Sequence, residues 1–199
     1  MTTRRSTGPL AHALTGALLV TGWLAASANA QEGSAHGSMR PDSSADHRAT
    51  PNGLVRTVRE ATERFRDVSV AEAEGYSLMF GCVSGPDSGA MGLHYVNLAL
   101  VGDGVLDASR PEIVIYEPLP DGRLKLTGAD FLVFAADWHA ANAVTPQLMG
   151  QLLHLFESPN RFGLPDFYTL HVWAWKPNPT GTFVNWHANV SCDAFRPTP

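Results

Sequence analysis

Between residues 76 and 135, short apolar runs alternate with turn residues, and this pattern restricts the chain to a sheet of short strands. A tight turn at Asp121 and Gly122 separates the third run from the fourth, which predicts a hairpin at that point. We therefore expect a mainly antiparallel sheet. The expected strands are residues 76–83, 90–101, 112–117 and 123–127, the last continuing through 130–135 after a bend at Gly128.

Helical patterns flank these strands in the sequence. An N-terminal amphipathic helix is predicted by apolar residues at helical spacing, Leu54, Val58, Ala61 and Phe65. A capping box formed by Ser69 and Glu72, with Gly75 as a stop, predicts a short helix over residues 70–74. Leucines at helical spacing predict a second substantial helix over residues 146–156. The second substantial helix would contain His154, whereas His139 falls in an expected loop. The predicted fold class is α+β, with a mainly antiparallel sheet of about five strands, the N-terminal amphipathic helix and a second helix before the last strands.

Residues 168–192, YTLHVWAWKPNPTGTFVNWHANVSC, hold three of the five tryptophans and are the richest candidate for a functional site. In a strand the side chains alternate between the two faces of the sheet. His171, Trp173 and Trp175 would then share one face, opposite Leu170, Val172 and Ala174. After a turn at residues 177–181, a short returning strand is expected over residues 182–187.

The N-terminus has the three parts of an export signal. Arg4 and Arg5 precede an apolar stretch over residues 11–24, and Ala28 to Ala30 form a small-x-small cleavage site. The apolar stretch is too short for a membrane span. We expect a cleavable signal peptide (residues 1–30), a disordered linker rich in Ser, Gly, Asp and Ala (residues 31–51) and a single globular α+β domain (residues 52–199). The mature protein would be secreted or periplasmic.

Charge and cysteine content narrow the function classes further. The formal net charge is −5, and removal of the leader would take away two arginines, so a nucleic-acid partner is disfavoured. The two cysteines, Cys82 and Cys192, are expected to form a disulfide in an oxidising compartment. Free thiols or metal ligation are the less favoured alternatives. The sequence contains no sign of oligomeric state.

Four short motifs carry a resemblance to known proteins: GLHYVN at residues 92–97, YEP at 116–118, HVWAW at 171–175 and NVSC at 189–192. Together they resemble an uncharacterised family of exported bacterial proteins with no assigned activity. That family often has an acidic residue and then an aromatic in the fourth strand, which Asp130 and Phe131 match. It has Asn-Pro where this chain has His187 and Ala188, so the resemblance implies no general role for His187.

Two histidines and two carboxylates could form a metal site. His94 and His171 each lie in the middle of an apolar strand, where an imidazole must be hydrogen-bonded or bound to something. Glu117 and Asp130 lie near the ends of neighbouring expected strands. If the four converge, they provide three or four ligands for a divalent metal, zinc, iron or copper. The chain would then be a metal-binding enzyme acting on a small molecule.

Two other readings of the same residues stay open. Tyr95, Asn97, Trp173 and Trp175 could line an aromatic pocket in which a small organic ligand is bound without catalysis. Alternatively, the aromatic residues and histidines are core residues of a structural or stress-related exported protein, which is the usual role of a single histidine on a strand. The sequence does not decide between catalysis and binding.

Overall fold

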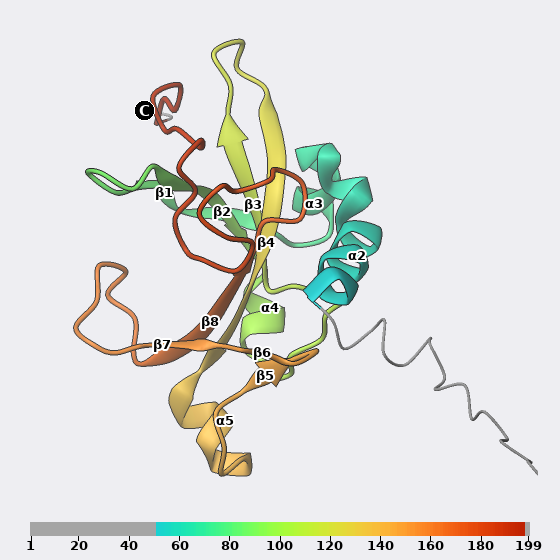
Figure 1. Cartoon of the computed structure of the whole chain (residues 1–199), viewed down its shortest axis with the longest axis vertical. Coiled ribbons are helices and arrows are strands. Elements are labelled where there is room, and N and C mark those ends of the chain that lie inside the picture. The colour runs from blue at the N-terminus through green and yellow to red at the C-terminus, as the bar shows by residue number, and fades with distance from the viewer. Residues whose placement is uncertain (1–50, 198–199) are drawn as a thin grey trace, which may run out of the picture. The chain divides into compact units, whose positions relative to one another are not determined.

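Six antiparallel strands form one sheet in the computed structural model of the chain, which describes residues 51–197 (Figure 1). The spatial order is β1-β2-β3-β4-β8-β7, and every pairing is antiparallel. The predicted α+β class and mainly antiparallel sheet are confirmed. The strands are β1 Ser77–Ser84, β2 Ala90–Val96, β3 Ile113–Pro118, β4 Leu124–Phe134, β7 His154–Phe156 and β8 Phe167–Val172.

The predicted hairpin between β3 and β4 is confirmed. Glu117 pairs with Lys125 beside the turn, and Gly122 in the turn has a φ of 82°. β4 runs without interruption through Gly128, where a side chain would place its Cβ 2.4 Å from the carbonyl oxygen of Val172 on β8. The absence of a side chain at Gly128 therefore lets β4 and β8 approach closely at the centre of the sheet.

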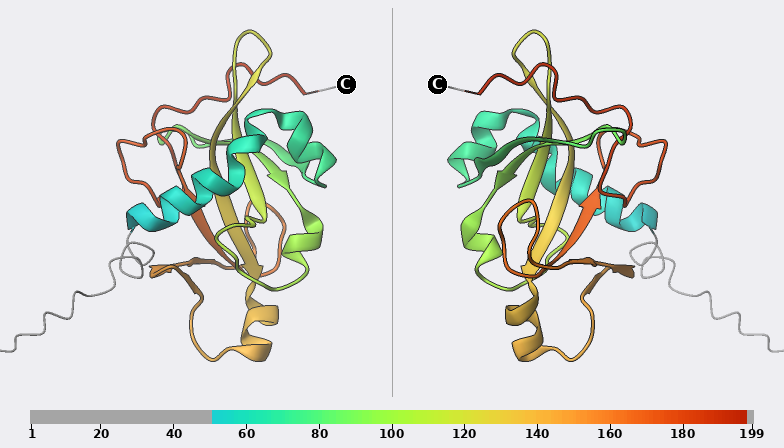
Figure 2. Two further views of the ribbon diagram at one scale, coloured as in Figure 1. Left: turned by 90° about the vertical axis from the view of Figure 1, so that its right-hand side faces the viewer. Right: turned by 90° about the vertical axis from the view of Figure 1, so that its left-hand side faces the viewer.

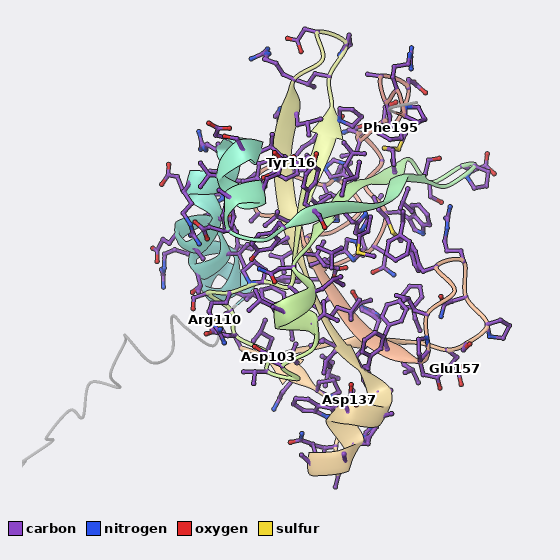
Figure 3. All side chains as sticks on the ribbon, turned by 180° about the vertical axis from the view of Figure 1, so that it is seen from behind. Asp103, Arg110, Tyr116, Asp137, Glu157 and Phe195 are labelled. Carbon is purple, nitrogen blue, oxygen red and sulfur yellow. A yellow bond between two sulfur atoms is a disulfide. The ribbon has the colours of Figure 1, made fainter. Side chains whose placement is uncertain are left out.

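The predicted N-terminal helix is confirmed as α2 (Pro51–Thr62), and it continues into a 3-10 turn, η1 (Glu63–Arg66). Leu54 and Val58 on α2 are fully buried against β4 and β8, so α2 covers one face of the sheet (Figure 2). The short helix α3 (Val68–Ala73) follows. Side chains fill both faces of the sheet, with Tyr116 in the interior (Figure 3).

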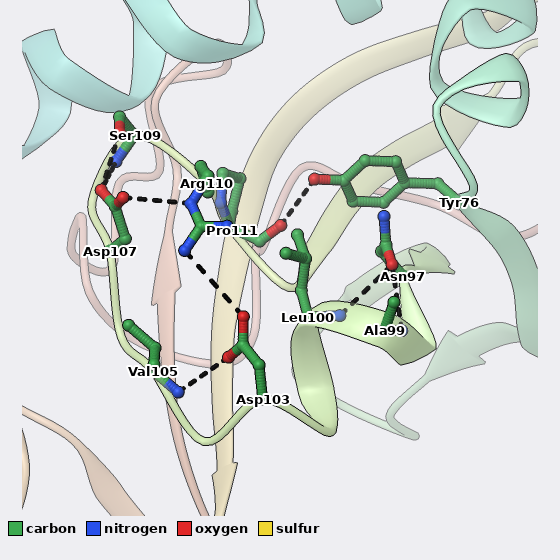
Figure 4. Close-up of polar contacts among 10 residues, drawn as sticks. All are labelled: Tyr76, Asn97, Ala99, Leu100, Asp103, Val105, Asp107, Ser109, Arg110 and Pro111. Atoms are coloured by element: carbon green, nitrogen blue, oxygen red, sulfur yellow. Dashed lines mark hydrogen bonds and ion pairs between the residues drawn. The ribbon is translucent and has the colours of Figure 1, made fainter.

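The second expected strand is shorter than predicted. It ends at Val96, because Asn97 begins a one-turn helix, α4 (Leu98–Val101). The Asn97 side-chain oxygen accepts hydrogen bonds from the backbone N–H groups of Ala99 and Leu100 in this turn (Figure 4). Its side-chain nitrogen donates to the carbonyl oxygen of Glu74. In the loop that follows, Arg110 forms ion pairs with two aspartates (Figure 4).

The predicted helix over residues 146–156 is wrong. That segment forms short strands, β5 (Gln147–Leu148), β6 (Gln151–Leu152) and β7, because Met149 and Gly150 have φ angles of 48° and 84° and turn the chain sharply. A right-handed helix requires negative φ. His154 therefore lies on a strand. The helix of this region is α5 (Ala135–Ala141), which contains His139, a residue expected in a loop.

The C-terminal segment is held to the sheet by one β-bridge and a disulfide. The predicted strand over residues 182–187 is not formed, and a single bridge between His187 and Ala90 takes its place. The predicted disulfide between Cys82 and Cys192 is confirmed, with an S–S distance of 2.04 Å. Within residues 51–197, no helix has the length and apolar character needed to cross a membrane. The predicted signal peptide and linker lie outside the described residues, apart from Pro51 at the start of α2.

Candidate metal centre

The alternation of side chains along β8 sorts the candidate site residues onto two faces. Leu170 and Val172 pack under α2, whereas Thr169, His171 and Trp173 face the other side of the sheet. This part of the predicted alternation is confirmed. For Trp175 it is wrong, because the chain leaves β8 after Val172, and the Trp175 indole packs on the α2 side. Its Nε1–H donates to Thr62, and Arg66 lies over its ring.

Three strands bring His94, Asp130 and His171 together on the face opposite α2. Asp130 on β4 is the direct cross-strand partner of His171 on β8, and His94 comes from β2. One ligand atom from each of the three lies within 4.8 Å of the others, and all three side chains are buried. In the described part of the chain, this is the one cluster of three or more potential metal ligands.

The spacing of the three groups suits a metal ion. His171 Nδ1 lies 3.4 Å from Asp130 Oδ1. Donors on a tetrahedral centre with bonds of about 2.1 Å lie about 3.4 Å apart, so these two atoms already have the required separation. The His94 and His171 rings are 5.7 Å apart between centroids and meet edge to face. Shifts of about 1 Å would bring all three donors to bonding distance of one ion.

Neighbouring groups orient two of the three side chains. His94 Nδ1 lies 3.3 Å from the carbonyl oxygen of Gly92. Because that oxygen can only accept, a neutral His94 hydrogen-bonded there carries its proton on Nδ1 and keeps the lone pair on Nε2. The Thr169 hydroxyl donates to Asp130 Oδ1 at 2.5 Å. Metal ligands commonly have such outer hydrogen bonds, which hold the imidazole tautomer and the carboxylate orientation.

His171 differs from the other two, because neither of its ring nitrogens has a hydrogen-bond partner although the residue is only 3% exposed. Asn185 lies close enough for a side-chain interaction of the hydrogen-bond type to raise the pKa of His171, but the geometry does not complete a hydrogen bond, and Asn185 Oδ1 also has no partner. A buried polar atom left without a partner costs about 1–3 kcal/mol. Such atoms need an explanation, and coordination of a metal ion is one of the accepted ones.

Burial sets the charge state of the cluster. Loss of solvation lowers the pKa of His94 to about 4, and repulsion from His171 is the next cause. Loss of solvation also lowers the pKa of His171 to about 3, and here the next cause is repulsion from His154. Both imidazoles are therefore neutral at pH 7, which is the form that binds metals. Burial also raises the pKa of Asp130 to about 6, although the hydrogen bond from Thr169 opposes this. Asp130 is then mainly a carboxylate at pH 7.

The predicted participation of Glu117 in this cluster is wrong. Its carboxylate forms an ion pair with Lys176, with distances of 2.8 and 2.6 Å from Nζ to the two oxygens. It also accepts the backbone N–H of Ser191. Glu117 therefore ties β3 to the C-terminal segment. The sequence prediction placed it at a strand end but had no information on Lys176, which lies 59 positions further along the chain.

The four residues of the predicted aromatic pocket do not come together in residues 51–197. Tyr95 follows His94 in β2, so strand alternation places it on the α2 side, where it packs against Tyr116. Asn97 caps α4. Trp173 alone lies on the face of the histidines, and Trp175 packs on α2. Strand alternation separates Tyr95 from the histidines, whereas Asn97 and Trp175 lie beyond the ends of the strands.

Sequence reasoning missed several residues around the cluster. Thr169 could have been found, because it precedes His171 by two and must share its face. His187, for which no general role was expected, is fully buried with its ring 4.8 Å from Trp173, and its Nδ1 accepts the Asn189 N–H. It lies outside the three-residue cluster. Asn185 carries no sequence signal, because the C-terminal loop brings it to His171.

Comparison of the chain with protein-family models, with curated proteins and with solved structures found no match. The resemblance to exported bacterial proteins therefore stays a prediction.

Proposed function

We propose that this chain is a metal-binding protein that holds one divalent transition metal, zinc, copper or iron, through His94, Asp130 and His171, and that it acts as an enzyme on a small molecule. The observation that carries the proposal is His171. Both of its ring nitrogens are buried without a hydrogen-bond partner, and one of them lies 3.4 Å from a buried carboxylate.

A metal accounts for these groups better than a purely structural role does. A core histidine is normally neutral and hydrogen-bonded, which describes His94 but not His171. Asp130 is a buried carboxylate, and in the described part of the chain neither a lysine nor an arginine forms an ion pair with it. A buried charge without compensation is costly. A cation between the three side chains would compensate Asp130 and accept the free lone pair of each imidazole.

The ligand set leaves room for chemistry. Three protein ligands, two imidazoles and one carboxylate, are typical of catalytic rather than structural metal sites, because positions stay open for water or substrate. Bound zinc would lower the pKa of a water molecule, whereas iron or copper would support reactions of oxygen. Neighbouring groups orient the ligands: the Gly92 carbonyl oxygen orients the His94 ring, and the Thr169 hydroxyl orients the Asp130 carboxylate.

The proposed compartment is the periplasm or the extracellular medium. The disulfide between Cys82 and Cys192 supports this, because disulfides persist in oxidising compartments. Export itself rests on the predicted signal peptide.

Metal analysis tests the proposal directly. The mature chain, purified without an affinity tag and stripped with a chelator, should take up one equivalent of zinc, copper or iron. A ligand at about 100 times its dissociation constant stabilises the folded state by about 2.7 kcal/mol, which a thermal-unfolding scan detects. Asp130→Asn keeps the side-chain shape, and His171→Gln replaces the imidazole with a neutral polar side chain. Both substitutions should abolish the uptake and the stabilisation.

Glu117→Gln is the matched control, because Glu117 is another buried carboxylate on the same sheet that pairs with Lys176 instead of the cluster. This variant should keep the metal stoichiometry even where its stability falls. Absence of uptake by the unmodified chain would refute the proposal. Loss of uptake in Glu117→Gln to the same degree as in Asp130→Asn would also refute the assignment of the ligands.

A further inference from the structure

The proposed metal ligands form one wall of an otherwise apolar cavity of ≈ 30 Å³. One water molecule needs about 10–15 Å³, so the space holds only a few atoms. The polar side chains that line it are those of His94, Asp130, Thr169 and His171. The rest of the lining is aliphatic or aromatic and includes four phenylalanines, Phe80, Phe156, Phe162 and Phe167.

The solvent side of this cavity is made of phenylalanine rings. Phe80 is the exposed member of the lining, at 45% of its surface, whereas the metal ligands at the other end are buried. The Phe80 and Phe162 rings pack edge to face with 5.3 Å between their centroids. Phe162 in turn packs edge to face on Phe167, with 6.2 Å between the ring centroids. A molecule that moves from solvent toward His171 through this lining must pass between aromatic rings.

The backbone at Phe80 has an unusual conformation. Phe80 has a φ of 65°, a left-handed conformation that residues with a Cβ rarely adopt, and Gly81 beside it has a φ of 64°. In the pairing with β2, Met79 lies opposite His94 and Cys82 lies opposite Leu93, so Phe80 and Gly81 form a bulge. Bulges redirect side chains and occur next to active sites. Here the bulge directs the Phe80 ring to the cavity of His94.

We propose that the substrate of the metal centre is a small uncharged molecule with an apolar body, and that Phe80 and Phe162 gate its passage from solvent. The choice of an uncharged molecule follows from the entrance, because a charged group that passes between the phenylalanine rings would lose its hydration where no polar side chain replaces it. Gating follows from the small volume: any molecule beyond a few atoms needs the rings to turn aside. This inference rests on the proposed metal centre.

Three probes of similar size test the substrate class: toluene is neutral, benzoate negative and benzylammonium positive. Each is added to the full mature chain, both metal-free and loaded with cobalt(II), whose visible spectrum responds to changes near the ion. Toluene should bind to both forms and shift the cobalt spectrum. In the metal-free form, where benzoate has no ion to coordinate, the two charged probes should bind about tenfold more weakly or worse than toluene. Equal binding of benzoate and toluene by the metal-free form would overturn the proposal.

Rates of toluene binding and release test the gate. Phe80→Gly relieves the left-handed backbone and removes the ring, and Phe162→Ala removes the second ring. Both variants should exchange toluene about threefold faster or more. Leu78→Ala is the matched control, because Leu78 lies on the same strand and is 39% exposed but does not line the cavity. A change of rate in Leu78→Ala as large as that in Phe80→Gly would refute the gate.

The two proposals fail in different ways. Cobalt uptake with a spectrum that toluene leaves unchanged would overturn the inference on substrate and leave the metal centre in place. Toluene binding without any metal uptake, and with faster exchange in Phe80→Gly, would overturn the metal centre. The gate would then stand as the entrance of an apolar binding cavity.

Discussion

Glu112, just before β3, is predicted to make the stability of this protein fall as the pH rises. Its side chain is 1% exposed, and one carboxyl oxygen accepts the backbone N–H of Leu132 at 3.1 Å. Burial is the main cause that raises the pKa of Glu112 from 4.5 to about 8, and the nearby Asp130 and Asp103 add to it. Its own backbone N–H and that of Leu132 oppose the shift without cancelling it.

The sign of the effect follows from proton binding. Between pH 4.5 and about 8 the folded chain keeps a proton on Glu112 that the unfolded chain has released, so each rise in pH favours the unfolded state. At 1.36 kcal/mol per pH unit, this interval corresponds to about 5 kcal/mol. Relaxation and water near the carboxylate reduce that figure, and we expect a loss of about 2–4 kcal/mol between pH 5 and pH 8.5.

Glu112→Gln should remove this loss, because the amide keeps an acceptor oxygen for Leu132 and does not ionise. Urea unfolding of both proteins from pH 5 to pH 9, with a chelator present, measures the difference. The variant should match the unmodified chain at pH 5 and exceed its free energy of unfolding by about 2–4 kcal/mol at pH 8.5. Glu157→Gln, at an exposed carboxyl on the periphery (Figure 3), controls for the loss of one negative charge. A difference that does not change with pH would show that our account of Glu112 is wrong.

Three further predictions concern the site and the C-terminal segment. Thr169→Val removes the hydroxyl that orients Asp130 and should weaken metal binding about 10- to 100-fold in a competition titration, with little effect on the fold. Gly89→Ala would place its Cβ 2.1 Å from the carbonyl oxygen of His187, so it should lower the melting temperature more than Gly104→Ala, where φ is also positive but nothing lies within 4 Å. Equal losses would argue against this contact. Reduction of the disulfide, which spans 110 positions, should cost up to about 4.7 kcal/mol of unfolding free energy, and an unchanged urea midpoint would contradict this.

Local patterns predicted most of the sheet, because each strand and turn is encoded by neighbouring residues. The hairpin at Asp121 and Gly122 and the amphipathic helix from Leu54 are examples. The prediction failed at residues 146–156, where leucines at helical spacing were misleading. Leu148 in β5 and Leu153, between β6 and β7, are both buried there, on either side of a tight turn at Met149 and Gly150. Periodicity over one segment does not distinguish these two arrangements when tertiary packing decides which residues are buried.

The candidate site was predicted in part for a similar reason. The sequence predicts His94 and His171 as ligands because they lie within apolar strands, and Asp130 because it lies near a strand end, and the structure brings all three together. Glu117 is predicted on the same ground as Asp130, yet Lys176 pairs with it from a distant part of the chain. The prediction that Tyr95 lines a pocket with Trp173 is wrong, because Tyr95 is adjacent to His94 in a strand and its side chain therefore lies on the opposite face of the sheet. The phenylalanine lining was not predicted at all.

The sequence by itself determined the class of fold, the disulfide partners and the residue types that could bind a metal, because these depend on composition and on patterns within single strands. Only the tertiary structure decided which of those residues meet, because strand order and register set the neighbours of His171: Asp130 on β4, His94 on β2 and Asn185 in the C-terminal loop. The tertiary structure also buries both ring nitrogens of His171 without a hydrogen-bond partner. That loss of solvation, which no local pattern encodes, is the physical reason to expect a metal at this place.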